Sequence, residues 1–184
     1  TAQVLESGIT KSAFYAYAKQ RGLTGVKGVL AQLMTVPQAY ETAIDMALGA
    51  AQQNIVTDTE ETAKELINYL RQNRLGRATF LPMSAIRGKT LYGNERNALK
   101  LPGCLGVASE LVQCAPEYRG IVENLLGRTV IADNLDHGIP IMRAGNHAFR
   151  LVTLEGDVMH SGGSMTGGSA QSKVSNPVSY THLR

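Results

Sequence analysis

Two short glycine-containing segments carry residue types that could do chemistry. In the first, Arg87-Gly88-Lys89-Thr90, a lysine and a hydroxyl follow a glycine, as in loops that hold a nucleotide and Mg²⁺. Such a loop needs another glycine five residues before Gly88, where Met83 stands, and the residues after Thr90 are polar rather than an apolar helix. A small nucleotide-binding enzyme using Gly88, Lys89 and Thr90 is therefore third among the functions that we consider.

The second segment, residues 162–168, reads Gly-Gly-Ser-Met-Thr-Gly-Gly. A dinucleotide-binding loop would open a strand–helix–strand unit, but no helix and strand follow this segment. A nucleophile elbow needs a glycine two residues after Ser164, and Thr166 occupies that position. We therefore predict no catalytic residue here. The glycines either form an ordinary terminal loop or let a strand edge approach another chain closely.

The cysteines and histidines show no metal-binding pattern. Cys104 and Cys114 are ten residues apart without a Cys-x-x-Cys motif, and the histidines are scattered at positions 137, 147, 160 and 182. We therefore predict neither a metal site nor a cofactor. The apolar runs fall far short of the roughly 20 residues that cross a bilayer. These short runs predict no membrane partner, and the absence of a glycosylation acceptor favours a reducing cytoplasm.

Charge is strongly segregated along the chain, although the net charge is only +3. Residues 41–65 contain six acidic residues and one basic residue, whereas residues 71–100 contain seven basic residues and one acidic residue. A basic stretch of this size can attract nucleic-acid phosphates, or it can be a solvated face.

Apolar residues make up 43% of the sequence, enough for a globular core.

The elements that must position these segments form two similar halves. Residues 1–22 are predicted to be helical, as the end of a coiled coil. In the first half, an apolar stripe predicts a helix after Pro37, and a capping box at Asp58 and Glu61 predicts a second helix. Seven positions recur at an offset of 78, namely Gly28/Gly106, Val29/Val107, Leu33/Leu111, Tyr40/Tyr118, Ile44/Val122, Leu48/Leu126 and Gly49/Gly127.

The second half follows the shared pattern of helices and strands less closely than the first. Gly138 and Pro140 interrupt the helix expected after Asp133, which should therefore be short or kinked. Residues 149–154 are predicted to form a strand that turns at Gly156-Asp157.

We therefore predict a mixed α/β (α+β) fold with two related small lobes. The first lobe spans residues 23–82, and the second spans residues 104–169 with the glycine-rich segment. Residues 83–103 are predicted to be a polar, basic connector, and residues 170–184 a disordered tail.

The glycine spacing Gly156-x6-Gly163-x3-Gly167-Gly168 closely resembles the glycine signature in the hinge domain of bacterial structural-maintenance-of-chromosomes (SMC) proteins. Segments 25–29, 40–49 and 76–82 match the pattern of that hinge in the same order. The resemblance covers residues 22 to 169.

The resemblance implies a dimerisation module rather than an enzyme. In this family the hinge joins two long coiled-coil arms of a chromosome condensation and segregation ATPase, whose ATP-binding head domains lie outside this chain. Two hinges pair so that exposed strand edges of one chain complete the sheet of the other. The interface residues implied are Gly156, Gly163, Ser164, Met165, Thr166, Gly167 and Gly168.

The resemblance also implies weak, salt-sensitive DNA binding without sequence preference. Candidate DNA-binding residues are Lys19, Arg21 and Lys173 near the coiled-coil junction, and Arg87 and Lys89 on the connector. The expected partners are a second copy, DNA and, through the full-length protein only, accessory condensin subunits. The expected location is the cytoplasm, at the chromosome. The alternative is a monomeric nucleic-acid-binding module that uses the basic stretch 71–100.

Overall fold

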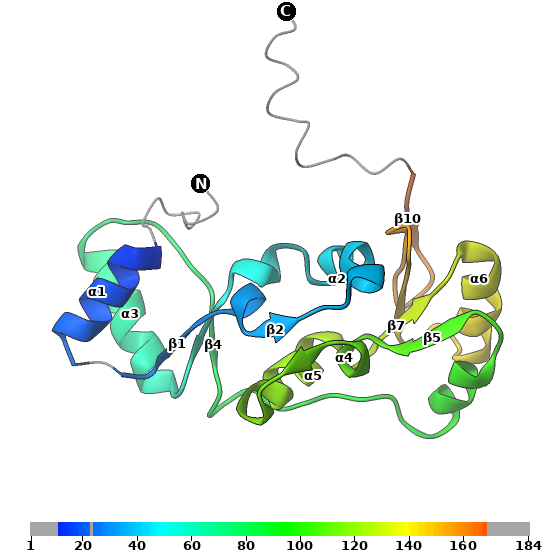
Figure 1. Cartoon of the computed structure of the whole chain (residues 1–184), viewed down its shortest axis with the longest axis horizontal. Helices are drawn as coiled ribbons and strands as arrows, with labels where there is room; N and C mark the ends of the chain where they lie inside the picture. The colour runs from blue at the N-terminus through cyan, green and yellow to red at the C-terminus, as the bar shows by residue number, and fades with distance from the viewer. Residues whose placement is uncertain (1–10, 23, 169–184) are drawn as a thin grey trace, which may run out of the picture.

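The computed structural model describes residues 11–22 and 24–168 of the 184-residue chain. The molecule is elongated, with α1 (Lys11–Gln20) and α3 (Glu60–Gln72) at one end and α6 (Leu135–Ala144) at the other (Figure 1). The predicted first helix is present as α1. Its residues before position 11, the predicted tail and Lys173 lie outside the described residues.

The first half builds a small sheet around β3 (Ile55–Thr57). β1 (Val26–Val29) pairs antiparallel with β3, and β4 (Phe80–Pro82) pairs parallel with it on the other side, so the strand order is β1-β3-β4. The remaining elements between β1 and α3 are η1 (Leu30–Gln32), β2 (Met34–Thr35), η2 (Gln38–Tyr40), α2 (Glu41–Leu48) and η3 (Gly49–Gln53).

The second half repeats this arrangement around β7 (Thr129–Ala132). β5 (Cys104–Val107) pairs antiparallel with β7, and β8 (Arg150–Thr153) pairs parallel with it. Even the irregularities repeat, because the ladders of β1 and β5 both shift register just before a glycine, Gly28 or Gly106. Two further strands extend this sheet to the order β10-β9-β8-β7-β5. The other elements are α4 (Ala108–Leu111), β6 (Gln113–Cys114), η5 (Pro116–Tyr118), α5 (Arg119–Leu126), β9 (Val158–Met159) and β10 (Met165–Thr166).

Three apolar cores lie in sequence along the molecule. α3 covers the outer face of the small sheet, α6 covers the outer face of the large sheet, and α2 and α5 share the central core between the sheets. Successive strand residues alternate between cores, so Val130 and Leu151 face α6, whereas Ile131 and Val152 face the centre. β2 pairs with β6, and α2 packs on β8. The two halves therefore share one core.

The segment 83–103, predicted to be a polar connector, contributes to the core around α6. It contains η4 (Gly93–Lys100), and Leu91 and Ala98 are buried. Isolated apolar residues among polar ones show neither a helical nor a strand period, so the sequence did not indicate their burial. The boundaries of the two lobes remain predictions.

α3 starts one residue later than the capping box predicted. Its N-cap is Thr59, whose Oγ1 accepts the N–H of Thr62 at 3.2 Å, rather than Asp58. The Asp58 carboxylate instead accepts the N–H of Thr59 at 2.6 Å and the hydroxyl of Thr62 at 2.7 Å. Both side chains can cap this turn, and only the backbone conformation decides which of them does.

α6 is unbroken, contrary to the expected interruption at Gly138 and Pro140. It is ten residues long, against thirteen in α3, and Pro140 lies inside it. Gly138 allows close packing on the sheet, because a Cβ there would lie 2.9 Å from Cδ2 of Leu151.

Across the described part of the chain, we find no helix with the length and apolar character that a membrane span requires.

Candidate dimerisation edge

The glycine-rich segment forms an exposed edge strand of the large sheet. β10 pairs antiparallel with β9, with Met165 opposite Met159 and Thr166 opposite Val158. Residues 161–168 are all exposed, and Met165 retains 50% of its accessible surface. β10 lies in the second half of the molecule, far from α1 and between α2 and α6 in this view (Figure 1). Six of the seven predicted interface residues, positions 163–168, are thus on one hairpin.

The backbone of Met165 directs its hydrogen-bonding groups away from its own sheet. The N–H of His160 donates to the carbonyl of Ser164 at 2.8 Å, so these two residues form a hydrogen-bonded pair of the ladder. Bonded and non-bonded pairs alternate along antiparallel strands, so Met165 belongs to a non-bonded pair and its N–H and C=O point outward. An edge of this kind can receive another strand.

Side chains of the same hairpin hold β10 in place. The carboxylate of Asp157 accepts the N–H of Gly168 at 3.3 Å, and the N–H of Asp157 donates to Oγ1 of Thr153 at 3.1 Å. Nε2 of His160 lies 3.0 Å from Oγ1 of Thr166, within hydrogen-bonding distance. These contacts all lie within one chain, so its own side chains hold the edge in place.

The glycines that flank β10 are required by the hairpin itself. Gly163 and Gly168 have φ of +115° and +126°, which residues with a side chain rarely adopt. Gly167 lies against Asp157, where a Cβ would be 2.3 Å from Oδ1. Substituting these glycines would deform the hairpin, so such variants do not test a dimer interface cleanly.

Gly156 lies apart from the rest of the signature. It is buried in the turn between β8 and β9 with φ of +96°, and a Cβ there would lie 3.2 Å from Met46 and 3.4 Å from Thr42, both in α2. Its close approach is to a helix of its own chain. A role for Gly156 in dimerisation remains a prediction.

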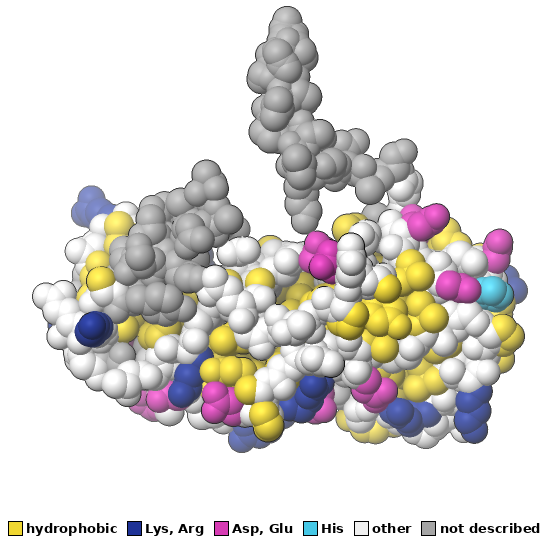
Figure 2. All heavy atoms as spheres, in the orientation of Figure 1, with side chains coloured by type: hydrophobic (Ala, Val, Ile, Leu, Met, Phe, Trp, Pro, Cys, Tyr) yellow, Lys and Arg dark blue, Asp and Glu magenta, His cyan; other side chains and the backbone are white. Residues whose placement is uncertain are grey.

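The predicted DNA-binding residues are dispersed rather than gathered on one surface. Lys19 and Arg21 lie at the end of α1, where Arg21 pairs with Glu65 at 3.4 Å. Arg87 and Lys89 are exposed beyond β4, and Arg87 donates to a carbonyl of its own loop at 3.0 Å. Figure 2 shows Lys and Arg side chains along one margin of the molecule with acidic side chains between them.

The structure also divides the basic stretch 71–100 into two parts. Residues 71–77 form the C-terminal end of α3 and the turn after it, at the end of the molecule that carries α1, whereas residues 87–100 run along the second half (Figure 1). Three exposed arginines in the first part, Arg71, Arg74 and Arg77, were not among the predicted site residues. Their close spacing in the sequence was the signal that could have identified them.

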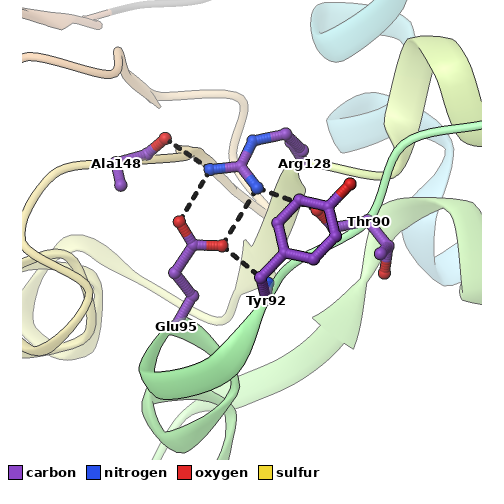
Figure 3. Close-up of polar contacts among 5 residues, drawn as sticks. All are labelled: Thr90, Tyr92, Glu95, Arg128 and Ala148. Carbon is purple, nitrogen blue, oxygen red and sulfur yellow. Dashed lines mark hydrogen bonds and ion pairs between the residues drawn. The ribbon is translucent and has the colours of Figure 1, made fainter.

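A partly buried ion pair attaches the segment 83–103 to the second half (Figure 3). Arg128 donates to both carboxylate oxygens of Glu95, at 2.9 and 2.8 Å, and to the carbonyls of Thr90 and Ala148, at 2.8 and 3.0 Å. The bonds from Arg128 hold the pKa of Glu95 below its usual range, and those to Glu95 raise the pKa of Arg128. With both terminal nitrogens engaged, we interpret this guanidinium as structural.

No metal centre is evident in the part of the chain that the structure describes, since no three His, Cys, Asp or Glu side chains are grouped to hold an ion. Cys104 and Cys114 are both free thiols. Burial raises the pKa of Cys104, which keeps the thiol protonated and weakly reactive.

Comparison with protein-family models matches residues 23–142 to the flexible hinge domain of SMC proteins. The chain is 47% identical over 157 residues to the chromosome partition protein Smc of Bacillus subtilis (strain 168), covering 85% of this chain and 13% of that protein. It is 49% identical over 150 residues to Smc of Desulfitobacterium hafniense (strain Y51), covering 81% of this chain and 12% of that protein. The chain therefore spans only a small part of the length of these relatives.

Two solved structures share the fold. A hinge domain of Geobacillus stearothermophilus SMC, described as an asymmetric dimer, matches with a TM-score of 0.79 and 42% identity, covering 86% of this chain and 66% of that one. The hinge domain of the Pyrococcus furiosus SMC protein matches with a TM-score of 0.70 and 29% identity, covering 95% of this chain and 92% of that one.

Proposed function

This chain belongs to the SMC hinge family, and on that premise we propose that it pairs with a second copy of itself through β10. Pairing would join the coiled-coil arms of a chromosome partition protein. The observation that carries the proposal is the outward N–H and C=O of Met165 on an exposed edge strand. The dimer described for the G. stearothermophilus hinge supports it.

Strand addition explains why such an edge is present. An exposed edge with unpaired backbone groups is an aggregation hazard, and proteins usually cover or shorten it. β10 is short but carries the half-exposed Met165, on the same face as buried Met159. A partner strand would satisfy the backbone groups and cover this apolar side chain.

The test replaces Met165 by proline and, as a matched control, by valine. Met165→Pro removes the outward N–H and places a ring in the path of a partner strand, while the bonds to β9 stay possible. Met165→Val removes the same thioether but keeps the donor. We expect dimer affinity, measured by light scattering over a dilution series, to fall about 10- to 100-fold for proline.

The two variants separate strand pairing from side-chain contact. A valine variant that dimerises like the parent, beside a proline variant that does not, would support pairing through the backbone. Equal dimerisation by both variants, with circular dichroism showing an intact fold, would refute it. A stable monomer of the parent chain at micromolar concentration would refute the dimer altogether.

We further propose weak DNA binding without sequence preference, as phosphate contacts from dispersed cations would give. A monomeric nucleic-acid-binding module remains the second candidate, supported by the basic stretch 71–100. The mass measurement distinguishes the two, because only the hinge function requires a dimer. Affinity that does not fall with added salt would contradict the phosphate contacts.

The wider role follows from the same premise. We propose that this hinge acts at the chromosome in the cytoplasm and contributes no catalytic residue of its own. ATP binding and accessory condensin subunits would belong to parts of the full-length protein beyond this chain.

A further inference from the structure

A hollow opens to solvent between the start of η4 and the end of α6. Its volume is about 290 Å³, close to the lower limit of roughly 300 Å³ for pockets that hold a small ligand. The hollow can therefore take one ring system of a ligand rather than a whole strand. Its walls are Tyr92, Asn94 and Glu95 on one side, and residues 144–146 and 148 on the other.

The ring of Tyr92 forms an exposed wall of this hollow. Tyr92 retains 63% of its accessible surface, the highest value among the exposed large apolar residues of the described chain. One side of the ring faces the guanidinium of Arg128, whose central carbon lies 5.8 Å from the ring centroid (Figure 3). An exposed aromatic ring of this kind is a platform on which a planar ligand can stack.

Hydrogen bonds within the chain hold this platform in position. The N–H of Tyr92 donates to Oε1 of Glu95 at 2.8 Å, and Arg128 in turn donates to both carboxylate oxygens of Glu95. Across the hollow, Asn146 and the next residue, His147, have φ of +59° and +55°, a region that residues other than glycine seldom occupy. Backbone conformations of this kind concentrate at ligand-binding sites.

The polar groups of the hollow favour a neutral ligand with a polar edge. Glu95 and Arg128 pair with one another at 2.8 Å, so their charges compensate each other and attract no external ion. The side-chain amides of Asn94 and Asn146 are exposed, and neither makes a hydrogen bond to another described residue. Each amide offers both donors and an acceptor, which are the groups that the edges of nucleobases also present.

We propose that this hollow binds one unstacked nucleobase of a single strand, with Tyr92 as the stacking platform; the inference rests on the proposed DNA binding and adds a base contact to it. Every nucleobase has a flat face that can stack on an aromatic ring, so the contact requires no particular sequence. Bases inside a duplex are stacked on one another and cannot enter the hollow, whereas those of a single strand can. The hollow therefore adds affinity for single strands only.

The experiment measures binding of a short fluorescent single strand of mixed sequence, and of the same strand annealed to its complement, across a salt series. Tyr92→Leu removes the ring and keeps an apolar side chain, whereas Tyr92→Phe keeps the ring and is the matched control. We expect Tyr92→Leu to lower affinity for the single strand at least about fivefold and to leave duplex affinity unchanged. Because no phosphate contact is lost, the slope of log affinity against log salt should stay the same. Tyr92→Phe should bind like the parent.

Asn146→Gly tests the opposite wall of the hollow. Glycine adopts positive φ readily, so this variant should fold like the parent while it lacks one amide. We expect its affinity for the single strand to fall about threefold, as the loss of one hydrogen bond would give. Circular dichroism of all three variants checks that the fold is intact.

Three results would overturn this site. If Tyr92→Leu binds the single strand like the parent, no base stacks on the ring. If Tyr92→Leu weakens single-strand and duplex binding equally, or lowers the salt slope, the residue does not act through an unstacked base. In both cases salt-dependent binding by the parent would keep the proposed DNA binding itself. No binding by the parent at low salt would refute both, while light scattering would still decide the dimer separately.

Discussion

The turns that lead into α3 in the first half and α6 in the second half share a backbone hydrogen bond but differ in their side chains. In the first half, the N–H of Asp58 donates to the carbonyl of Gly25 at 2.8 Å, and in the second half the N–H of Asp133 donates to Gly103 at 3.0 Å. The aspartate carboxylate then meets a side chain four residues later, the hydroxyl of Thr62 at 2.7 Å or Nδ1 of His137 at 2.8 Å. The repeat conserves the geometry of the turn while its chemistry differs.

The difference between Thr62 and His137 affects how tightly each turn is packed. A Cβ on Gly25 would collide with the carboxylate of Asp58, the mobile end of a side chain. A Cβ on Gly103 would lie 2.3 Å from Cβ of His137, which the helix holds in place. Gly103 also has φ of +84°. The second turn therefore tolerates change less than the first.

The largest expected effect is that of Gly103→Ala compared with Gly25→Ala. We expect Gly103→Ala to lower the free energy of unfolding by about 2–4 kcal/mol, because backbone strain adds to a contact that cannot move away. Gly25→Ala should lower it by about 1–2 kcal/mol, because Asp58 can rotate away at the cost of its capping bonds. Urea denaturation measures both, and the reverse order would show that the turns do not differ as described.

The next effect concerns the ion pair of Arg128 with Glu95, which attaches the segment 83–103 to the second half. Arg128→Met should lower the free energy of unfolding by about 2–3 kcal/mol, because it leaves a partly buried carboxylate and two carbonyls without their donor. Glu95→Gln keeps the shape and should cost less. Because the pKa of Glu95 is lowered on folding, its stabilisation is present above the unfolded pKa and is lost as pH falls through the folded pKa. Denaturation of Glu95→Gln at neutral and acidic pH should show less acid dependence than the parent.

A smaller effect tests the Asp58 carboxylate, which accepts the N–H of Thr59 and the hydroxyl of Thr62 at the start of α3. The hydroxyl of Thr62 holds the pKa of Asp58 below its ordinary value of 3.8. This carboxylate therefore stabilises the fold above that value, and the stabilisation is lost as pH falls through the lower folded pKa. Asp58→Asn should cost about 1 kcal/mol at neutral pH and progressively less in acid. A cost that stays constant down to strongly acidic pH would show that the charge of Asp58 does not contribute.

The smallest effect compares the ends of the same two helices. Arg74 follows the end of α3 with φ of +54°, and Asn146 follows the end of α6 with φ of +59°. Arg74→Gly should raise the free energy of unfolding by about 0.5–1 kcal/mol, whereas Asn146→Gly should change it by less, because asparagine already tolerates positive φ. Thermal denaturation of the two variants checks this. A loss of stability in Arg74→Gly would show that the arginine side chain stabilises the fold by more than its backbone conformation costs.

Much of the fold could be predicted because its signals are local. The apolar stripe after Pro37 and the recurring pairs such as Gly28 and Gly106 depend only on spacing along the chain. The strand around Leu151 and its turn at Gly156 were predicted for the same reason. The burial of Leu91 could not be predicted, because it depends on where α6 lies rather than on its neighbours in sequence.

The candidate site was predicted only in part for the same physical reason. Residues 163–168 lie on one hairpin because they are contiguous, but the sequence left open whether they form a terminal loop or a strand edge. The position of Gly156 under α2 depends on packing between the two halves, and so does the division of the basic stretch into two surfaces. Distances between surface charges depend on how segments far apart in the sequence pack together, and no local sequence pattern encodes that packing.

The sequence by itself determined the repeated α/β units, the family resemblance and the glycine-rich edge, because periodicity and backbone freedom are encoded residue by residue. Only the tertiary structure decided which groups meet. It placed α2 of the first half on the sheet of the second and turned the backbone of Met165 outward. Those outcomes arise from packing two related units around one shared core, where each contact joins residues far apart in the chain.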